Sequence, residues 1–154
     1  MDLTPAQLAA AVAVHEASHA ALALMAGRKN ARLRELIVRD DSSGLCRVLW
    51  RQQSPHSIIA GYVGELRALE GKDWRPTPQM FNDAMHLDDI ADAAAIVGVE
   101  RLPALWLETV PMVDRAWHRI QAMAAALQRS GRLSGAEAEA IWLSSTQATE
   151  EPQS

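Results

Sequence analysis

Residues 11–27 read AVAVHEASHAALALMAG, a sequence rich in alanine and leucine with two histidines in its middle. Its alanines are the strongest helix formers, and their small side chains let neighbouring elements approach closely. Upstream, Thr4 is a good N-cap and Pro5 suits the first helical position, whereas Gly27 is a natural stop. The pattern therefore predicts one long helix over residues 5–26.

The most apolar part of the chain, residues 8–26, lies within this helix. It is long enough to cross a bilayer, but His15, Glu16, Ser18 and His19 interrupt its middle. Polar groups so deep in a membrane would be functional in their own right. We therefore expect the buried helix of a soluble domain and no membrane segment.

The HExxH motif places His15 and His19 on one face of this helix, one turn apart. Two imidazoles so placed can bind one Zn²⁺ ion, each through a nitrogen at roughly 2.0–2.1 Å. Metalloproteases use the glutamate of this motif, here Glu16, as a general base and not as a ligand. We expect Glu16 to take a proton from a zinc-activated water and to pass it to the leaving amine. The alternative is a polar stripe that meets solvent or a hydrogen bond in the core.

A catalytic zinc site also needs a third protein ligand and one open position. The densest group of acidic residues lies near the start of a later predicted helix. Carboxylate oxygens are common zinc ligands. Acidic residues also favour the first turn of a helix through its dipole alone. The candidates that the residues by themselves leave open are Asp88, Asp89, Asp92, His56, His86 and His118.

Composition restricts the class of protein. The chain has 154 residues, 49% of them apolar and 22% charged, which suits one domain with a real core. Its net charge of −4 argues against a nucleic-acid partner. A single cysteine, Cys46, and an N-terminus without the basic segment of a secretory signal favour a cytoplasmic location. We expect one metallopeptidase-like domain over residues 1–144 and a polar, disordered tail over residues 145–154.

The remaining pattern predicts a mostly α (α+β) fold with a β-hairpin or small sheet after the HExxH helix. Two short runs rich in branched residues, separated by the turn DDSSG, predict the strands. Prolines, glycines and capping residues delimit the helices, and Pro111 is expected to kink or divide one of them. The expected elements are strands over 33–39 and 45–50, a helix over 55–70 and a loop over 72–82. A third helix is expected to begin between residues 82 and 88 and to reach about residue 97, a fourth to run from 103 to about 128, and a short last helix to follow Ser134 and carry Ile141 and Trp142.

In their order along the chain, these segments resemble the peptidase domain of the FtsH-type ATP-dependent zinc proteases, the M41 peptidases. The stretch AVAVHEASHAALALMAG resembles their HEAGH helix, with Ser18 where the family usually has glycine. LRELIVRDDSSGLCRVLW resembles the strand, turn and strand that follow. IIAGYVGELRALEG, HLDDIADAAAIV and IQAMAAALQRSGRLSGAEAEAIW are similar to the later helices, so that the resemblance covers about residues 6–143.

This resemblance implies a zincin-like peptidase domain and a third zinc ligand. In the family that ligand is the aspartate before the Ile or Leu of an Asn-Asp segment, a position that Asp89 occupies here, before Ile90. Asp88 is its main rival. His86 could compete with it or support a ligand. Ser18 adds a side chain near the site that could crowd an approaching helix.

The second strand is a candidate substrate-binding element. We expect it at the sheet edge beside the metal, where an extended peptide could add as a further strand; the alternative is an ordinary half-buried strand. Cys46 is expected to be a small buried residue. Arg47 and Arg51 are expected on a solvated face, with contact to a substrate carboxylate or carbonyl as the alternative. The candidate substrate-binding residues are Gly44, Leu45, Cys46, Arg47 and Val48.

Three functions remain open. The first is a zinc endopeptidase that cleaves unfolded or flexible polypeptides. Because the family carries an AAA+ module that is missing here, such an enzyme is expected to take flexible chains or to work beside a separate ATPase or adaptor. The second is a binding or regulatory module on a catalytically weak or inactive M41-like scaffold. The third is a metal-dependent hydrolase of another bond. The family forms rings, and a homo-oligomer is left open.

Overall fold

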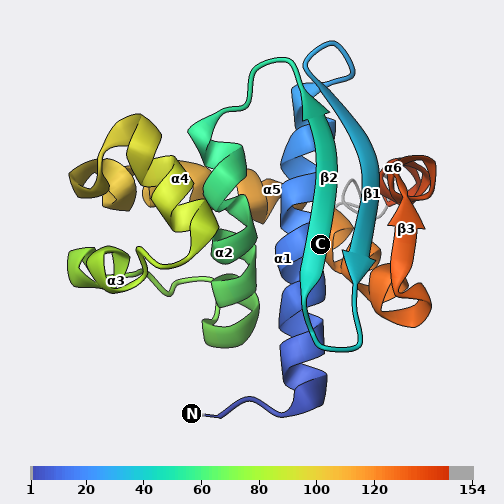
Figure 1. Cartoon of the computed structure of the whole chain (residues 1–154). Helices are drawn as coiled ribbons and strands as arrows, with labels where there is room; N and C mark the ends of the chain where they lie inside the picture. The colour runs from blue at the N-terminus through green and yellow to red at the C-terminus, as the bar shows by residue number, and fades with distance from the viewer. Residues whose placement is uncertain (1, 146–154) are drawn as a thin grey trace, which may run out of the picture.

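Helices form most of the chain around one small antiparallel sheet, which confirms the predicted mostly α (α+β) class (Figure 1). The computed structural model describes residues 2–145. The polar tail expected over residues 145–154 therefore lies, apart from Ser145, outside the described residues. The elements are α1 (Pro5–Ala26), β1 (Ala31–Val38), β2 (Gly44–Trp50), α2 (Pro55–Glu70), α3 (Pro78–Asp83), α4 (Asp88–Val97), the 3-10 helix η1 (Val99–Arg101), α5 (Leu102–Ser130), β3 (Arg132–Ser134) and α6 (Gly135–Ser144).

Helix α1 is the central element, and it contacts α2, α5, β1 and β2 (Figure 1). Thr4 and Gln7 form a reciprocal capping box at its start, with Pro5 at the first helical position. Six of its ten alanines are buried, so the neighbouring elements pack against its backbone at short range. By length and composition α1 could cross a membrane, and 56% of its most apolar window is buried within the structure.

The sheet has the strand order β2-β1-β3, which places β2 at an edge. β1 and β2 form the predicted hairpin, with an irregularity between Leu33 and Glu35. The third strand, β3, has no counterpart among the predicted elements. Three residues are too few to show alternation, and β3 pairs with a strand that is distant in sequence. The sheet is thus completed by a tertiary contact and not by local pattern.

The loop expected over residues 72–82 is wrong in part, because it contains the short helix α3. Phe81 of α3 is buried, and its ring centroid lies 5.8 Å from that of Trp106 on α5. A helix this short is marginal by itself. Packing of one aromatic side chain into the core therefore orders a segment that its prolines and turn residues mark as irregular.

Pro111 was expected to kink or divide a helix, and the division is wrong, because α5 continues through this residue. Proline removes the hydrogen bond to the carbonyl four residues earlier, which belongs to Leu107. Leu107 and Pro111 are both exposed, so water can solvate that carbonyl. The neighbouring Val110 and Val113 are buried and hold the helix against the core.

Candidate metal centre and active site

Helix α1 directs two imidazoles to one point. The Nε2 atoms of His15 and His19 lie 3.2 Å apart. The two rings are inclined at 72°, and their centroids are 4.9 Å from each other. The nitrogen atoms therefore converge while the rest of each ring diverges, which leaves each Nδ1 atom free to meet another partner.

Asp89, in the first turn of α4, completes the cluster. Its Oδ2 atom lies 3.3 Å from Nε2 of His15 and 3.1 Å from Nε2 of His19. Within residues 2–145, these three side chains are the one group of three whose ligand-type atoms lie close enough to share an ion. Segments more than 60 residues apart in sequence thus meet at a single point.

The other candidates for the third ligand have different surroundings. Asp88 and Asp92 line the surrounding cleft. His86 lines it too, and its Nδ1 atom donates to a backbone carbonyl at 3.1 Å. His56 pairs with a glutamate of α5 at 3.2 Å, and His118 is exposed on α5. The geometry therefore distinguishes Asp89 from its rivals.

The hydrogen bonds of the outer ring nitrogens determine where the lone pairs lie. Nδ1 of His19 is 2.8 Å from the carbonyl oxygen of Ser57, which can only accept, so the ring proton sits on Nδ1. Nδ1 of His15 faces Oε1 of Glu65 at 3.2 Å in the same manner. The Nε2 lone pairs of His15 and His19 and the carboxylate of Asp89 then face one another as three hydrogen-bond acceptors, with no N–H or O–H donor between them. Such an arrangement requires a cation, either a proton or a metal ion.

The separations of these three atoms fit zinc. In a tetrahedral site with bonds of roughly 2.0–2.1 Å, neighbouring ligand atoms are about 3.3–3.4 Å apart. The three separations measured here are 3.2, 3.3 and 3.1 Å. Three protein ligands leave the fourth position of a tetrahedron open, as catalytic zinc sites require.

One face of α2 supports the imidazoles, and the sequence pattern did not predict it. Ser57, Gly61 and Glu65 follow at four-residue spacing and so lie in one stripe. The outer two orient His19 and His15 through the contacts described above. At Gly61, a Cβ atom would lie 2.5 Å from both Nε2 atoms. In the sequence, this face is marked by a glycine with one polar residue four positions before it and another four positions after it. That spacing could have predicted it.

Ser18 does not keep α2 away, contrary to the crowding expected of it. Its side chain is fully buried, and its hydroxyl donates to the carbonyl of Val14 at 2.7 Å. Gly64 of α2 lies against it, and a Cβ atom there would collide with the serine Oγ. A glycine on α2 thus compensates for the serine on α1.

Glu16 lies between the imidazoles and β2. Its side chain is buried, and Gly44 makes room for its carboxylate, because a Cβ atom on Gly44 would lie 2.5 Å from Oε2. Burial raises the pKa of Glu16, although positive charge on His15 and His19 acts in the opposite direction. A raised pKa makes the carboxylate a better proton acceptor, as a general base requires.

The charges of the cluster favour a cation at its centre. Burial opposes a positive charge on His15, but hydrogen bonds to Asp89 and Glu65 outweigh it and raise the pKa of His15 to about 9. Burial also opposes the negative charge of Asp89, yet hydrogen bonds from both imidazoles hold its pKa well below its usual range. Proton and metal ion therefore compete for one position.

The cluster opens into a cleft of about 710 Å³ between α1, β2, α2 and the start of α4. Tyr62 of α2 lines this cleft and packs edge-on against His15, with ring centroids 4.6 Å apart. Burial raises the pKa of Tyr62 to about 12, so its hydroxyl stays protonated at neutral pH. Four of the five candidate substrate-binding residues line the cleft from β2, namely Gly44, Leu45, Cys46 and Val48.

Arg47, the fifth candidate, lies on the other face of the sheet. Successive side chains of a strand alternate between the two faces, so its neighbours Cys46 and Val48 face the cleft while Arg47 does not. Its guanidinium donates to Glu35 at 2.9 Å. Cys46 is half-buried in the cleft wall, and burial raises the pKa of its thiol.

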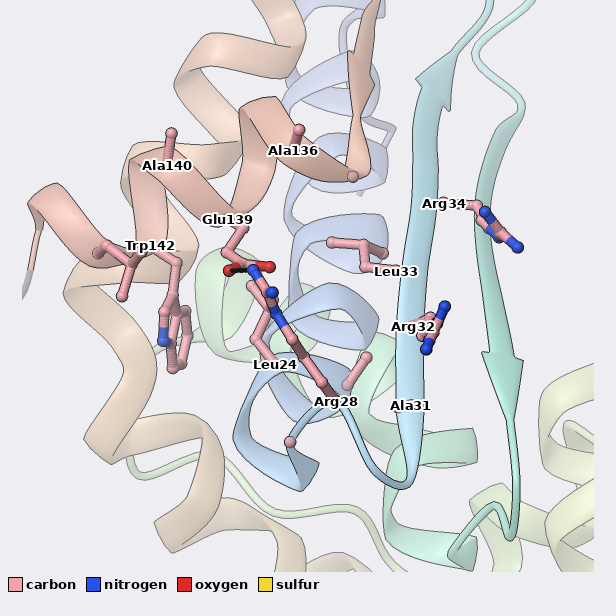
Figure 2. Close-up of a pocket in the computed structure, with 14 residues that line it drawn as sticks. Leu24, Arg28, Ala31, Arg32, Leu33, Arg34, Ala136, Glu139, Ala140 and Trp142 are labelled. Atoms are coloured by element: carbon pink, nitrogen blue, oxygen red, sulfur yellow. Dashed lines mark hydrogen bonds and ion pairs between the residues drawn. The ribbon is translucent and has the colours of Figure 1, made fainter.

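A separate hollow of about 640 Å³ lies between the C-terminal end of α1, β1 and α6 (Figure 2). Alanine and leucine side chains form much of its wall. An ion pair between Arg28 and Glu139 joins the turn after α1 to α6. Its lining contains no histidine, cysteine or aspartate, so the candidate chemistry belongs to the first cleft.

Comparison with known protein families agrees with this assignment at a coarse level. Residues 3–66 match the Peptidase M50B-like family, a stretch that contains His15, Glu16, His19 and Glu65 but ends before Asp89. No curated protein matches the chain. The match does not single out the M41 family. Residues 3–66, which carry two of the three clustered ligand atoms, are thus similar to a metallopeptidase family, a class that implies a bound metal, commonly zinc.

Proposed function

We propose that this chain is a zinc-dependent endopeptidase that hydrolyses peptide bonds in unfolded or flexible polypeptides. The proposal rests on one observation. The Nε2 atoms of His15 and His19 converge with a carboxylate oxygen of Asp89, at separations suited to a tetrahedrally coordinated ion. Glu16 lies beside this cluster in a buried position suited to a base.

The residues divide the chemistry among them. His15, His19 and Asp89 hold the ion, which when bound supplies Lewis acidity that makes water acidic near neutral pH and polarises a carbonyl. Glu16 accepts the proton of the attacking water and returns it to the leaving amine. Glu65 and the Ser57 carbonyl keep both imidazoles in the tautomer that presents Nε2.

The substrate side of the proposal rests on β2. This strand is at the edge of the sheet and lines the cleft, so an extended polypeptide can pair with its free edge. The cleft is open, which suits a chain better than a small enclosed molecule and favours a peptidase over a hydrolase of another bond. We also propose a cytoplasmic location, with a separate ATPase or adaptor as the partner that delivers folded substrates.

The test combines metal content with cleavage of unfolded casein. Purified protein is expected to hold about one zinc per chain by elemental analysis and to cleave casein. Glu16→Gln is expected to keep the zinc and to lose about 10²–10⁴-fold in rate, the usual contribution of a general base. Asp89→Ala is expected to lose the zinc, whereas Asp88→Ala retains it.

Two results would contradict the proposal. Cleavage that survives Glu16→Gln removes Glu16 as the base. Zinc-loaded protein that cleaves no unfolded substrate, yet captures a partner equally well after Glu16→Gln, indicates the regulatory module on a metal-binding scaffold.

A further inference from the structure

Positive charge is concentrated in the segment that contains β1 and β2. Residues 28–51 contain seven of the 15 lysines and arginines of the chain but only three of its 19 acidic residues. This segment therefore carries a net charge of +4, although the whole chain carries −4. The rest of the molecule is correspondingly acidic.

Three arginines of this segment, Arg32, Arg34 and Arg47, lie on the outer face of the sheet, away from α1. Arg32 and Arg34 leave β1 on the side opposite to Leu33, which points toward α6 (Figure 2). Both arginines are exposed, and so is Leu49 of β2, which pairs with Arg32 and is 55% exposed. Arg47 leaves β2 toward the same face, because it lines the hollow on that face and is not among the residues that line the cleft.

One carboxylate is shared between two of these guanidiniums. Glu35 of β1 accepts from Arg47 of β2 at 2.9 Å and from Arg132 of β3 at 2.7 Å. The hydrogen bond from Arg47 holds the pKa of Glu35 below its usual range. The two arginine side chains remain 62% and 70% exposed, whereas that of Glu35 is 10% exposed. Glu35 thus anchors both guanidiniums while most of their donors stay available to a ligand.

This face is hollowed, and the hollow adjoins the candidate active site. Its volume is about 670 Å³. Glu35 is its one acidic lining residue among those that the structure describes, against three arginines. Cys46 and Val48 line both this hollow and the cleft of the metal cluster, so β2 is a wall common to the two. The lining residues are Arg34, Glu35, Cys46, Arg47, Val48, Leu49 and Arg132.

We propose that this face makes the enzyme selective for acidic segments of its polypeptide substrate, an inference that rests on the proposed peptidase function. When an extended chain pairs with the free edge of β2, every second side chain lies over the outer face, level with Arg47 and Leu49. Asp or Glu at those positions meets the guanidinium donors that Glu35 leaves available, while the alternate side chains enter the cleft. Because β2 lines both the basic face and the cleft, a peptide paired with β2 contacts the two at once. The rest of the molecule is acidic and repels large polyanions.

The experiment compares two peptides of equal length that differ at alternate positions, with Glu in one and Gln in the other. Zinc-loaded full-length protein is expected to cleave the Glu peptide with a kcat/KM about fivefold higher, mainly through KM, because a cross-strand pair of opposite charge contributes modestly. The preference is expected to shrink in 0.5 M NaCl, since exposed charges are screened.

Matched variants locate the preference. Arg34→Gln and Arg47→Gln are each expected to bring the ratio of the two kcat/KM values toward one. Arg115→Gln removes the same charge from an exposed position on α5 and is expected to leave the ratio unchanged. A ratio near one in the parent protein, or a ratio that Arg34→Gln and Arg47→Gln do not alter, overturns the inference while cleavage itself upholds the proposed function.

Direct binding separates the two proposals. Fluorescence anisotropy with labelled peptides is measured on the zinc-loaded Glu16→Gln protein, which needs no turnover. Preferential binding of the Glu peptide that depends on Arg47, with no cleavage by the parent protein, supports the acidic-segment surface and refutes the peptidase. Phosphatidylserine vesicles or single-stranded DNA that bind through the same arginines, without discrimination between the peptides, assign the face to another partner and overturn the inference.

Discussion

Oε1 of Glu65, on α2, lies 3.2 Å from Nδ1 of His15, on α1. The two helices therefore share the task of presenting one imidazole, because the carboxylate holds the proton on Nδ1 and leaves Nε2 available to a metal ion. Residues that orient a ligand in this manner influence metal affinity without touching the metal.

Glu65→Gln is expected to weaken zinc binding about 10–100-fold, the usual effect of losing such a partner. Competition with a chromophoric chelator measures the change. Glu70→Gln, an exposed position on the same helix, is the control and is expected to have no effect. Equal affinities for the parent and Glu65→Gln would show that the carboxylate does not orient His15.

Gly61→Ala is expected to disrupt the metal site more than the fold. The added Cβ atom would lie 2.5 Å from both Nε2 atoms, so the imidazoles or α2 must move. Insertion of a methyl group into a packed site costs about 1–3 kcal/mol. We expect loss of bound zinc by elemental analysis, together with a lower midpoint of urea unfolding. A variant that still holds one zinc per chain would contradict the close approach of α2.

Gly64→Ala is expected to destabilise the fold by a comparable amount, because its Cβ atom meets the buried Oγ of Ser18. Ser18→Gly removes the obstacle, so the double variant is expected to recover most of the stability lost by Gly64→Ala. Urea unfolding of the parent protein, the two single variants and the double variant gives the coupling energy between the two positions. Effects that simply add would show that the two residues are not in contact.

The pH dependence of stability is expected to differ in direction with and without zinc. In the metal-free chain the folded pKa of His15 is about 9, above the ordinary value of 6.5. The stabilisation from its charged form is therefore complete below pH 6.5 and is lost as the pH rises to about 9. Zinc must displace that proton, so its affinity rises over the same range.

Urea unfolding at pH 6 and pH 9, with EDTA or with zinc, measures this difference. The metal-free protein is expected to be less stable at pH 9 by the contribution of His15, whereas the stabilisation added by zinc is expected to be larger at pH 9. Calorimetry in buffers of different ionisation enthalpy is expected to show release of about one proton per zinc at pH 7.5. An increment from zinc that is equal at both pH values would contradict competition at His15.

Local sequence is enough to predict α1, the pairing of His15 with His19, and the hairpin of β1 and β2. The alanines and the capping box of residues 4–27 fix α1, and the spacing of His15 and His19 makes their nitrogens converge, because both features depend on local backbone geometry. The mostly α (α+β) class and the hairpin followed from turn and capping residues and from two short runs rich in branched residues.

The contacts between groups far apart in sequence depend on the packing of whole helices and strands. The contact of Asp89 with both imidazoles, the stripe of α2 that carries Glu65 and Gly61, and the third strand β3 all join segments far apart in the chain. The same is true of α3, which one buried aromatic ring orders. Their positions follow from how whole helices pack, and packing depends on the shapes of complete surfaces, which no local pattern encodes.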